Sequence, residues 1–268
     1  MMVEQNKWRS TVEQIKRSFT TKGRTQLNAY SIEGIRLHER ALHAAQTLVL
    51  TVVSHSFWQD PTERAARLKN EITLSKHECI VIPDEVMNEL TNGRSLGDIL
   101  SLVEKPNTPD LEGLVTAVPN PTLLIAQGII DPGNIGAMIR TAHANNATAF
   151  IVCEGSDPYH PKAVRTTMGS IFKMPVVSIS SINDLLQILQ RLNIETVGAV
   201  AENGVLLPAM HFSQKGTALF MGNEYFGLPD QLINQLNRLI TIPMATGIDS
   251  MSVNAATAVV LYEIQRQK

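Results

Sequence analysis

The 268-residue sequence has few cysteines, little net charge and no long apolar run. Its two cysteines, Cys79 and Cys153, lie far apart without the spacing of a disulfide framework or a zinc site, so we expect reduced thiols and no metal. No stretch of about 18 apolar residues could span a bilayer, and MMVEQNKWRS is polar where a secretory signal would be apolar. These absences predict a soluble, cytoplasmic protein without a membrane partner, and the 44% of apolar residues suffice for a buried core.

The formal net charge of −2 argues against a generally basic nucleic-acid binder, but the charge is unevenly distributed. Residues 1–40 carry eight positive and four negative side chains, a balance of +4 that leaves −6 for the rest of the chain. A basic segment on an otherwise acidic chain is typical of a surface that binds a polyanion. A solvated helix face would give the same pattern, and both interpretations stay open.

Strand-like and helix-like patterns alternate through the second half of the chain. Short apolar runs, several of them rich in β-branched residues and bounded by proline, glycine or polar residues, are typical of buried strands. Helix-period patterns separate them, which favours a parallel sheet covered by helices on both faces. The predicted strands are residues 43–53, 78–83, 121–130, 148–153, 174–179, 195–201, 217–222 and 238–243, and helical patterns begin at Asn134, Ile182, Leu228 and Ser250.

A proline-rich segment divides the chain into two predicted α/β domains. Residues 103–121, VEKPNTPDLEGLVTAVPNP, contain four prolines and no sustained period, which is typical of a linker. The predicted domains cover residues 1–106 and 117–268. In the first domain we expect a helix over residues 32–46, a strand near 48–53, and helices around 61–74 and 84–92.

The stretch DPGNIGAMIRTAHANNA, residues 131–147, resembles a phosphate-binding glycine loop at first sight. A dinucleotide-binding fold needs three glycines at fixed spacing after its first strand, and a nucleotide triphosphatase needs Gly-Lys-Ser/Thr at the start of its helix. Here only Gly133 and Gly136 lie in the turn and no lysine follows, so both kinds of phosphate site are excluded. A Rossmann-type methyltransferase is not indicated either, because no other glycine-rich turn follows a first strand.

The same stretch suits a polar ligand site. Residues 131–133, Asp-Pro-Gly, form a turn signal, and Asn134 is a plausible N-cap for a helix over about 135–145. Arg140 lies one turn after Gly136, whose missing side chain would let the guanidinium lean back towards Asn134. The pattern predicts a cation and an amide at the carboxyl edge of the sheet, where open α/β proteins bind ligands. An ordinary capped helix with an exposed arginine is the alternative.

Two further turns combine glycine with hydrogen-bonding side chains. In MGNEYFGLPDQL, Gly222 permits a close approach and Glu224 places a carboxylate just past a strand end. In IPMATGIDSMSVNAATAVVLYE, Ser250 can cap a helix whose first turn contains Ser252 and Asn254, and polar groups at the start of a buried helix need partners. Convergence of the three turns would form a neutral-to-cationic pocket for an adenosine-bearing cofactor and a ribose hydroxyl.

These segments resemble the motifs of the SpoU (TrmH-like) family of RNA ribose 2′-O-methyltransferases, within the SPOUT superfamily. The matching segments are DPGNIGAMIRTA, FMGNEYFGLP and IPMATGIDSMSVNAATAVVLYE, and DPYHPKAVRTTMGSIFKMPV is similar to the family's connecting segment. The resemblance covers about residues 120–268 in the expected order. The first domain, with YSIEGIRLHERAL, is similar to the L30e-like RNA-binding domain that many members carry.

The resemblance implies an enzyme that transfers a methyl group from S-adenosylmethionine to a ribose 2′-hydroxyl of rRNA or tRNA. It also implies a deep trefoil knot in a mainly parallel α/β domain, and a homodimer whose active site takes residues from both subunits. By position in the motifs, the implied cofactor contacts are Ala199, Gly222, Ile242 and Met251. The implied catalytic group is Asn134, Arg140, Glu224, Ser250, Ser252 and Asn254.

The third motif departs from the family pattern Ser-Leu-Asn-Val-Ser, because residues 250–254 of this chain read Ser-Met-Ser-Val-Asn. Leucine to methionine conserves volume, but the amide moves two positions, about 200° around a helix, so Asn254 does not simply replace the missing asparagine. We favour an active enzyme that works through Ser252, because the other two motifs are intact. The alternative is a non-catalytic RNA-binding or assembly protein, whereas the separate basic segment argues against a small-molecule methyltransferase.

The remaining polar candidates carry weaker signals. The seven histidines, among them His38, His143 and His160, show no metal spacing and are interpreted as surface or hydrogen-bonded side chains. Lys162 and Arg165 lie in the connecting segment, which faces either RNA or solvent.

Overall fold

The computed structural model describes residues 7–74, 77–94 and 98–268, which form two compact units. Unit 1 consists of Met1–Pro106 together with Tyr159–Phe172, and unit 2 consists of Asn107–Pro158 and Lys173–Lys268. None of the helices in the described part of the chain has the length and apolar character that a membrane span requires.

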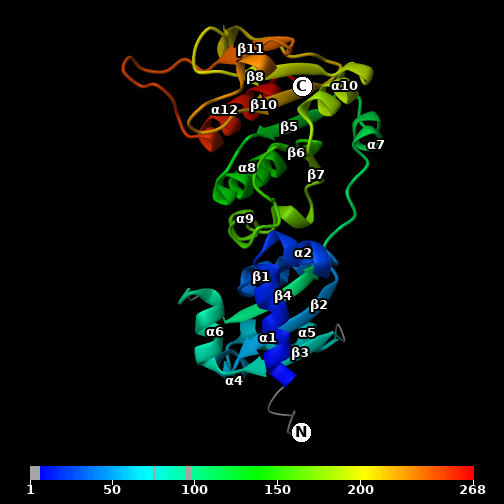
Figure 1. The fold of residues 1–268 in the computed structure, drawn as a ribbon, viewed down its shortest axis with the longest axis vertical. Coiled ribbons are helices and arrows are strands. Elements are labelled where there is room, and N and C mark those ends of the chain that lie inside the picture. The colour runs from blue at the N-terminus through cyan, green and yellow to red at the C-terminus, as the bar shows by residue number, and fades with distance from the viewer. Residues whose placement is uncertain (1–6, 75–76, 95–97) are drawn as a thin grey trace. The chain divides into compact units, whose positions relative to one another are not determined.

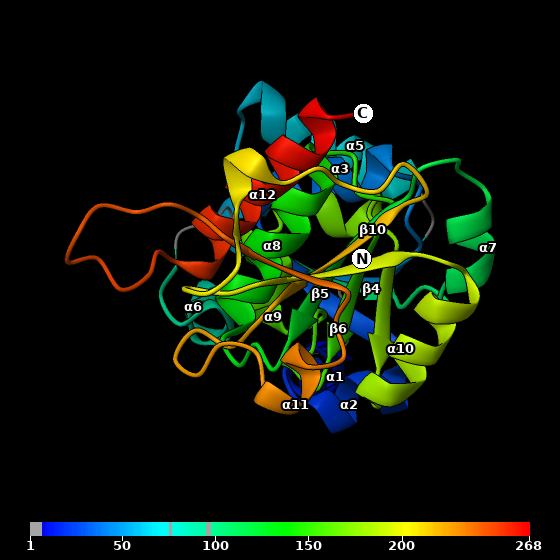
Figure 2. The same cartoon turned by 90° about the horizontal axis from the view of Figure 1, so that it is seen from above.

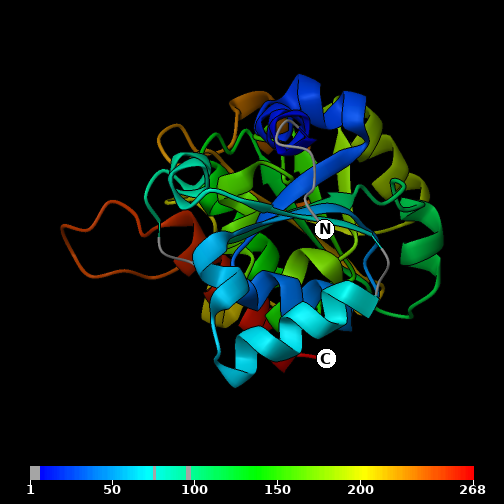
Figure 3. The same cartoon turned by 90° about the horizontal axis from the view of Figure 1, so that it is seen from below.

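Unit 1 is built on a four-stranded sheet with helices on both faces (Figures 1 and 3). The strand order is β1-β4-β2-β3, in which β4 runs antiparallel to both neighbours and β2 runs parallel to β3. The elements are α1 (Lys7–Ser18), α2 (Thr21–Leu27), β1 (Ala29–Glu33), α3 (Ile35–His43), β2 (Leu48–Ser54), α4 (His55–Gln59), α5 (Glu63–Leu74), β3 (Glu78–Ile82), α6 (Asp84–Thr91), β4 (Ile99–Glu104), α9 (Pro161–Thr166) and a 3₁₀ turn, η1 (Ser170–Phe172).

Two apolar clusters bury the faces of this sheet. Ile15 of α1 packs with Leu50 and Val52 of β2, whereas the next residue along, Val53, packs with Leu68 of α5. Such alternation follows from the two-residue period of a strand. Unit 1 therefore has its own core on both sides of its sheet.

The predicted helix over residues 32–46 is wrong at its start. Residues Ala29–Glu33 form the buried strand β1, and α3 begins only at Ile35. Gly34 separates the two with φ of 87°, a left-handed value that glycine adopts without strain. The strand has a weak sequence signal because the polar Ser31 and Glu33 interrupt its apolar residues. The strand predicted over 43–53 is likewise shortened to β2, because α3 and its C-terminal turn occupy residues 43–45 and the strand begins only at Leu48.

The segment Tyr159–Phe172 packs against β1 within unit 1. The ring of Tyr159 lies 4.9 Å from that of Tyr30, and Arg165 Nη1 donates to Glu33 Oε2 at 3.1 Å. Arg94 also donates to the Glu33 carboxylate, at 3.1 Å. Arg165 therefore pairs with a buried carboxylate of the protein, which accounts for its position without RNA.

Unit 2 contains a seven-stranded sheet in the order β7-β6-β5-β10-β8-β11-β9, and every neighbouring pair is parallel. Figure 2 shows α8 and α12 on one side of the central strands and α7 and α10 on the other. The elements are α7 (Leu111–Thr116), β5 (Thr122–Gln127), α8 (Pro132–Ala144), β6 (Ala149–Cys153), β7 (Val176–Ile179), α10 (Ile182–Arg191), β8 (Glu195–Ala199), β9 (Val205–Leu206), a 3₁₀ turn η2 (Leu207–Ala209), β10 (Thr217–Met221), α11 (Asp230–Ile233), β11 (Arg238–Thr241) and α12 (Val253–Arg266).

The parallel sheet predicted from the apolar runs is confirmed. All residues of β5, β6 and β10 are buried, because helices cover both faces of the sheet. Leu123 and Ile125 of β5 pack with Leu185 and Leu189 of α10 on one face. Burial on both faces explains why these strands read as continuous apolar runs rather than alternating ones.

Two predictions in unit 2 are wrong in detail. The expected linker contains α7, which is capped by Asp110 and buries Leu111 and Val115 in the core. The expected helix from Leu228 is only the four-residue α11, because Asn234 ends it and β11 begins at Arg238. In the segment from Leu228, the leucine spacing reflects burial of single side chains, among them Leu228 and Leu232, rather than a long helix.

Candidate active site

The turn after β5 is organised by an aspartate and a proline. Asp131 Oδ1 accepts a hydrogen bond from Gly133 N at 2.7 Å, and Pro132 occupies the first helical position of α8. The cap is therefore Asp131, and the predicted N-cap at Asn134 is wrong. Asp131-Pro132 is a stronger helix-start signal than Asn134. The aspartate carboxylate accepts a hydrogen bond from an otherwise unpaired backbone amide, and proline has no amide hydrogen that needs a partner. Asn134, inside the first turn, keeps its side chain free for another partner.

The turn after β10 is a tight hairpin-like loop. Asn223 and Gly227 exchange backbone hydrogen bonds of 3.0 and 2.9 Å, and Gly227 has φ of 68°. A Cβ atom on Gly222 would lie 2.3 Å from the carbonyl carbon of Gly227. Glycine is thus required at position 222 by the loop itself, and its backbone remains able to contact a ligand.

Two hydrogen bonds join these turns. Asn134 Nδ2 donates to Glu224 Oε1 at 2.6 Å, and Asn223 Nδ2 donates to the carbonyl of Gly128 at 2.8 Å. Strands β5 and β10 are neighbours in the sheet, so their carboxyl ends bring together residues that are about 90 positions apart. The predicted convergence of the first and second motifs is present in the structure.

Arg140 provides a free cation on the same helix as Asn134. It lies on α8, it is exposed, and it forms no hydrogen bond or ion pair with any other residue that the structure describes. A guanidinium in that state has its five N–H donors open to an anionic ligand.

The third motif reaches the first through α12. Ser252 is the N-cap of α12, where its Oγ accepts from Ala255 N at 3.3 Å, so the cap predicted at Ser250 is wrong. Asn254 Oδ1 accepts a hydrogen bond from Thr141 Oγ1 at 2.9 Å, and this bond joins α12 to α8 beside Arg140. The amide of Asn254 thus braces two helices.

Ser250 and Met251 are not brought to the Asn134–Glu224 pair. Both are exposed on the loop of residues 242–252, which projects from the rest of unit 2 (Figure 1). The structure describes all of residues 244–251. Within this range, the backbone forms one hydrogen bond outside helices and strands, from Ile248 N to Ala245 O. The other amides and carbonyls of residues 244–251 are open to a ligand.

The residues implied to hold the cofactor lie at neighbouring strand ends. Ala199 ends β8, Gly222 follows β10 and Ile242 follows β11, and β8 adjoins both other strands. A close-packed glycine and a loop with unpaired backbone groups suit an adenosine that is bound mainly through the main chain. The chemistry of this edge therefore fits S-adenosylmethionine.

Neither cysteine has the character of a nucleophile. Burial raises the pKa of the Cys79 thiol to about 11. Burial, together with the charge of Glu154, raises the pKa of the Cys153 thiol to about 11. Both remain protonated at neutral pH, and a protonated thiol is a poor nucleophile.

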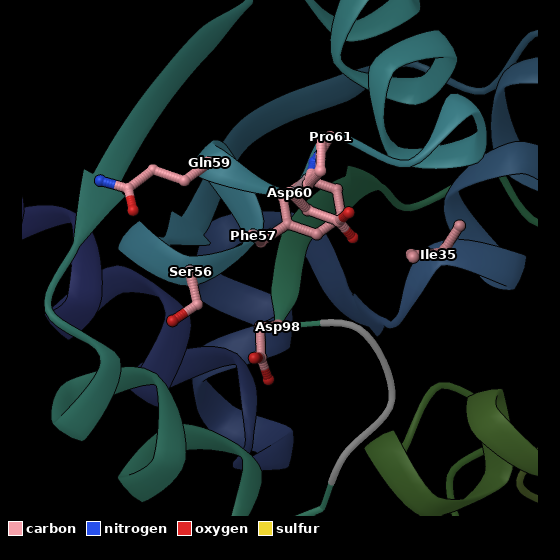
Figure 4. A pocket seen from close by; sticks show the side chains of 7 residues that line it. All are labelled: Ile35, Ser56, Phe57, Gln59, Asp60, Pro61 and Asp98. Atoms are coloured by element: carbon pink, nitrogen blue, oxygen red, sulfur yellow. The ribbon is translucent and has the colours of Figure 1, made fainter.

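A separate cavity lies in unit 1 and was not found from the sequence. Its volume is about 370 Å³, and Figure 4 shows carboxylates of Asp60 and Asp98 among its lining. Ser56, also in the lining, donates to Asp84 through both its amide and its hydroxyl. Two carboxylates would repel a phosphate or a substrate anion, so the strand-end site of unit 2 is the better candidate.

Comparison with known proteins agrees with this geometry. Residues 121–262 match the model of the SpoU rRNA Methylase family. The chain belongs to this family. Among curated relatives, the 23S rRNA (guanosine(2553)-2′-O)-methyltransferase RlmP of Bacillus subtilis (strain 168) is 27% identical over 256 residues, which cover 95% of each protein.

Solved structures of methyltransferases share the fold of this family member. The AdoMet-bound rRNA methyltransferase from Sinorhizobium meliloti has a TM-score of 0.81 and 25% identity, and the match covers 99% of this chain and 97% of that one. The SpoU methyltransferase AviRb from Streptomyces viridochromogenes, in complex with AdoMet, has a TM-score of 0.85 and 24% identity, covering 96% and 97%. The predicted SPOUT fold class is therefore confirmed.

Two supporting residues were missed from the sequence. Asn223 fixes the second turn, and Thr141 holds Asn254. Thr141 follows Asn134 by seven residues, two helical turns, and so shares its face of α8, which is a signal that the sequence contains. Its partner on α12 has no such signal, because the two helices are 113 positions apart at this contact.

Proposed function

We propose that this protein transfers a methyl group from S-adenosylmethionine to a ribose 2′-hydroxyl of rRNA or tRNA. The observation that carries the proposal is the Asn134–Glu224 hydrogen bond, which joins two motifs at the carboxyl edge of a parallel sheet with the free Arg140 on the same helix as Asn134. The 23S rRNA methyltransferase relative, aligned over nearly the whole chain, supports RNA as the substrate.

The residues of the strand-end site have separable tasks. When bound, S-adenosylmethionine would supply a methyl group on positive sulfur. Its transfer to the 2′ oxygen would leave the bonding pair on sulfur and release the hydroxyl proton to solvent. The chain's contribution is then chiefly to hold the 2′ oxygen in line. Because a guanidinium stays protonated in proteins, we assign Arg140 to gripping an adjacent phosphate and to stabilising negative charge that develops on the 2′ oxygen.

The pair of Asn134 and Glu224 fixes this geometry. Glu224 accepts from the amide of Asn134, so each side chain limits the rotamers of the other. Ser252 caps α12, and Asn254 keeps α12 against α8, so the altered third motif retains a defined position for Arg140. This brace favours an active enzyme over a non-catalytic RNA-binding protein.

Cofactor binding is assigned to the strand ends and the following loop. Ala199, Gly222 and Ile242 would contact the cofactor through their backbones, and Met251 would approach it from the loop. An active site completed by a second copy of the chain, as in the implied homodimer, would also bring Ser250 and Met251 near a site. A cytoplasmic location stays a prediction.

RNA binding outside the active site is assigned to unit 1. Arg24 is only 3% exposed and donates to the carbonyl of Ser18, so it serves the fold. Lys16 pairs with Glu89 at 3.6 Å. Lys22 and Arg36 are exposed and form no ion pair with another described residue, which leaves them for phosphate contacts.

Methyl incorporation tests the proposal. With labelled S-adenosylmethionine and unmodified 23S rRNA or bulk tRNA, the wild type should incorporate label, and Arg140→Ala should lose on the order of 100-fold or more in kcat/KM. Arg140→Lys should remain strongly impaired, because lysine lacks the planar fork. The matched control is Arg191→Ala on α10, an exposed arginine that pairs with Glu112.

The outcomes separate the candidate functions. Near-normal turnover by Arg140→Lys would contradict the role of a planar fork. Calorimetric binding of S-adenosylhomocysteine without any incorporation by the wild type would instead favour the non-catalytic RNA-binding protein.

A further inference from the structure

Two aromatic rings stand in solvent beside the candidate active site. Tyr225 is 89% exposed and Phe226 is 86% exposed, although both belong to the second motif. Their ring centroids are 6.5 Å apart, with planes inclined by 58°. Exposed rings of this size carry large apolar surfaces and are costly in water unless a ligand covers them.

The backbone below these rings is fixed. Asn223 Oδ1 accepts from Tyr225 N at 2.9 Å and from Phe226 N at 3.2 Å, and Asn223 also bonds to Gly227 and to the carbonyl of Gly128. The loop therefore holds both rings outward on an ordered turn. Exposure here is a property of the turn and not of a fraying segment.

The position of the rings relates them to the transfer site. Tyr225 directly follows Glu224, which binds Asn134, and Asn223 ties the loop to the first-motif turn at Gly128. Ile130, in that same first-motif turn, is also 69% exposed. Apolar side chains from both turns thus border the polar pair that we assign to positioning the ribose.

We propose that Tyr225 and Phe226 form a stacking platform for an unpaired RNA base next to the nucleotide whose ribose is methylated. This inference rests on the proposed function. A ribose held at the Asn134–Glu224 pair carries bases on either side, and single-stranded RNA is bound by stacking its bases on aromatic side chains. Arg140 supplies the complementary contact to a phosphate. The rings carry no charge of their own, so they suit a base face and not the phosphate backbone.

Two short RNA probes isolate the stacking contribution. Both are fluorescein-labelled 12-mers, one oligouridylate and one with the same riboses and phosphates but abasic. For each probe, fluorescence anisotropy gives the ratio of the Kd of Tyr225→Ala/Phe226→Ala to that of the wild type. We expect about tenfold weaker binding on oligouridylate, equivalent to ~1.4 kcal/mol, and a ratio near one on the abasic probe. Tyr225→Phe/Phe226→Tyr, which keeps both rings, should bind both probes as the wild type does.

The results that would contradict the stacking platform differ from those that would contradict the proposed function. Equal ratios on the two probes would overturn the platform, because the rings would then not sense bases. A halved mass of the double-alanine variant by light scattering would overturn it in favour of contact with a second copy. Methyl incorporation by the wild type is measured in parallel: if it occurs while the ratios are equal, only the platform fails. If the wild type incorporates no methyl group, the proposed function fails. The placement of the stacked base beside a methylated ribose then fails too, whatever the Kd ratios on the two probes.

Discussion

His38 shows how one buried side chain sets the pH dependence of unit 1. The Gly34 carbonyl can only accept, so His38 Nδ1 donates to it at 2.8 Å, and Nε2 accepts from Ser101 Oγ at 2.8 Å. Ser101 Oγ also forms a hydrogen bond of 2.5 Å with Thr51 Oγ1, and Thr51 Oγ1 forms one of 2.7 Å with His77 Nε2. The prediction that this histidine is a hydrogen-bonded structural residue agrees with its surroundings.

Burial lowers the pKa of His38 from 6.5 to about 4, because the ion would lose its hydration. Between these values the unfolded chain binds a proton that the folded chain does not, so stability falls as pH decreases through this window. From pH 7.5 to pH 5 we expect unit 1 to lose about 2 kcal/mol of unfolding free energy through His38. Trp8 and Trp58, the two tryptophans, both belong to unit 1 and report its urea unfolding by fluorescence.

The matched variant is His38→Gln, which keeps a donor and an acceptor but has no group to titrate. Its unfolding free energy should change less than that of the wild type between the same pH values, by about 2 kcal/mol. Equal changes in both proteins would show that His38 does not cause the dependence. His77, whose pKa burial also lowers, remains in both proteins.

At the scale of the elements, the turn after β10 depends on Gly222. A Cβ there would meet backbone atoms of Gly227 and Leu228 at 2.3–2.5 Å, and backbone cannot swing aside as a side chain can. Gly222→Ala should therefore cost about 1–3 kcal/mol of unfolding free energy. It should also lower methyl transfer, because a displaced loop carries Glu224 away from Asn134.

Gly227→Ala is the control in the same turn. Its Cβ would enter open space, and only its φ of 68° opposes the change, at a cost of about 1 kcal/mol. Thermal unfolding and a transfer assay on both variants check the difference. An unfolding free energy of Gly222→Ala equal to that of the wild type would contradict the close packing.

The elements of unit 2 were more predictable than those of unit 1, for a physical reason. Strands β5, β6 and β10 are buried on both faces and read as unbroken apolar runs. Strands β1 and β4 contain polar residues, and these are stabilised by distant partners: Glu33 by Arg94 and Arg165, and Ser101 by His38. Partners 61 and 132 positions away leave no local pattern.

The same distinction applies to the candidate site. Glycine and polar residues directly after strands indicated Asn134 and Glu224, because carboxyl ends of parallel strands share one edge. The contact itself depends on β10 lying beside β5, and strand order is not encoded in either turn. The role of Asn254 could not be foreseen, because Thr141 lies on another helix.

For the whole molecule, the basic charge of unit 1 should govern RNA affinity. Deletion of residues 1–106 would be a poor test, since Tyr159, Val164 and Ile171 of the segment Tyr159–Phe172 are buried within unit 1 and would be uncovered. Charge reversal avoids this problem. Lys22→Glu/Arg36→Glu should weaken RNA binding and reduce the dependence of log Kd on log salt by roughly one for each phosphate that the variant no longer binds.

Anisotropy titrations of an rRNA fragment at several KCl concentrations measure this change, with S-adenosylhomocysteine binding as the internal control for unit 2. The double substitution Lys215→Glu/Lys173→Glu in unit 2 provides the same change in net charge elsewhere. If both double variants lose equal affinity, the effect is one of net charge, and the assignment of RNA binding to unit 1 is wrong.

Because the segment Tyr159–Phe172 belongs to unit 1, unit 1 cannot complete its fold until late in translation. The chain passes between the units three times, after residues 106, 158 and 172, so no single peptide-bond cleavage separates them. During translation, Tyr30 and Glu33 emerge well before Tyr159 and Arg165, their partners. At ~5–20 residues per second, the 66 residues from 106 to 172 take roughly 3–13 s to synthesise. For that time during synthesis, the sheet of unit 1 lacks its contacts with the segment Tyr159–Phe172.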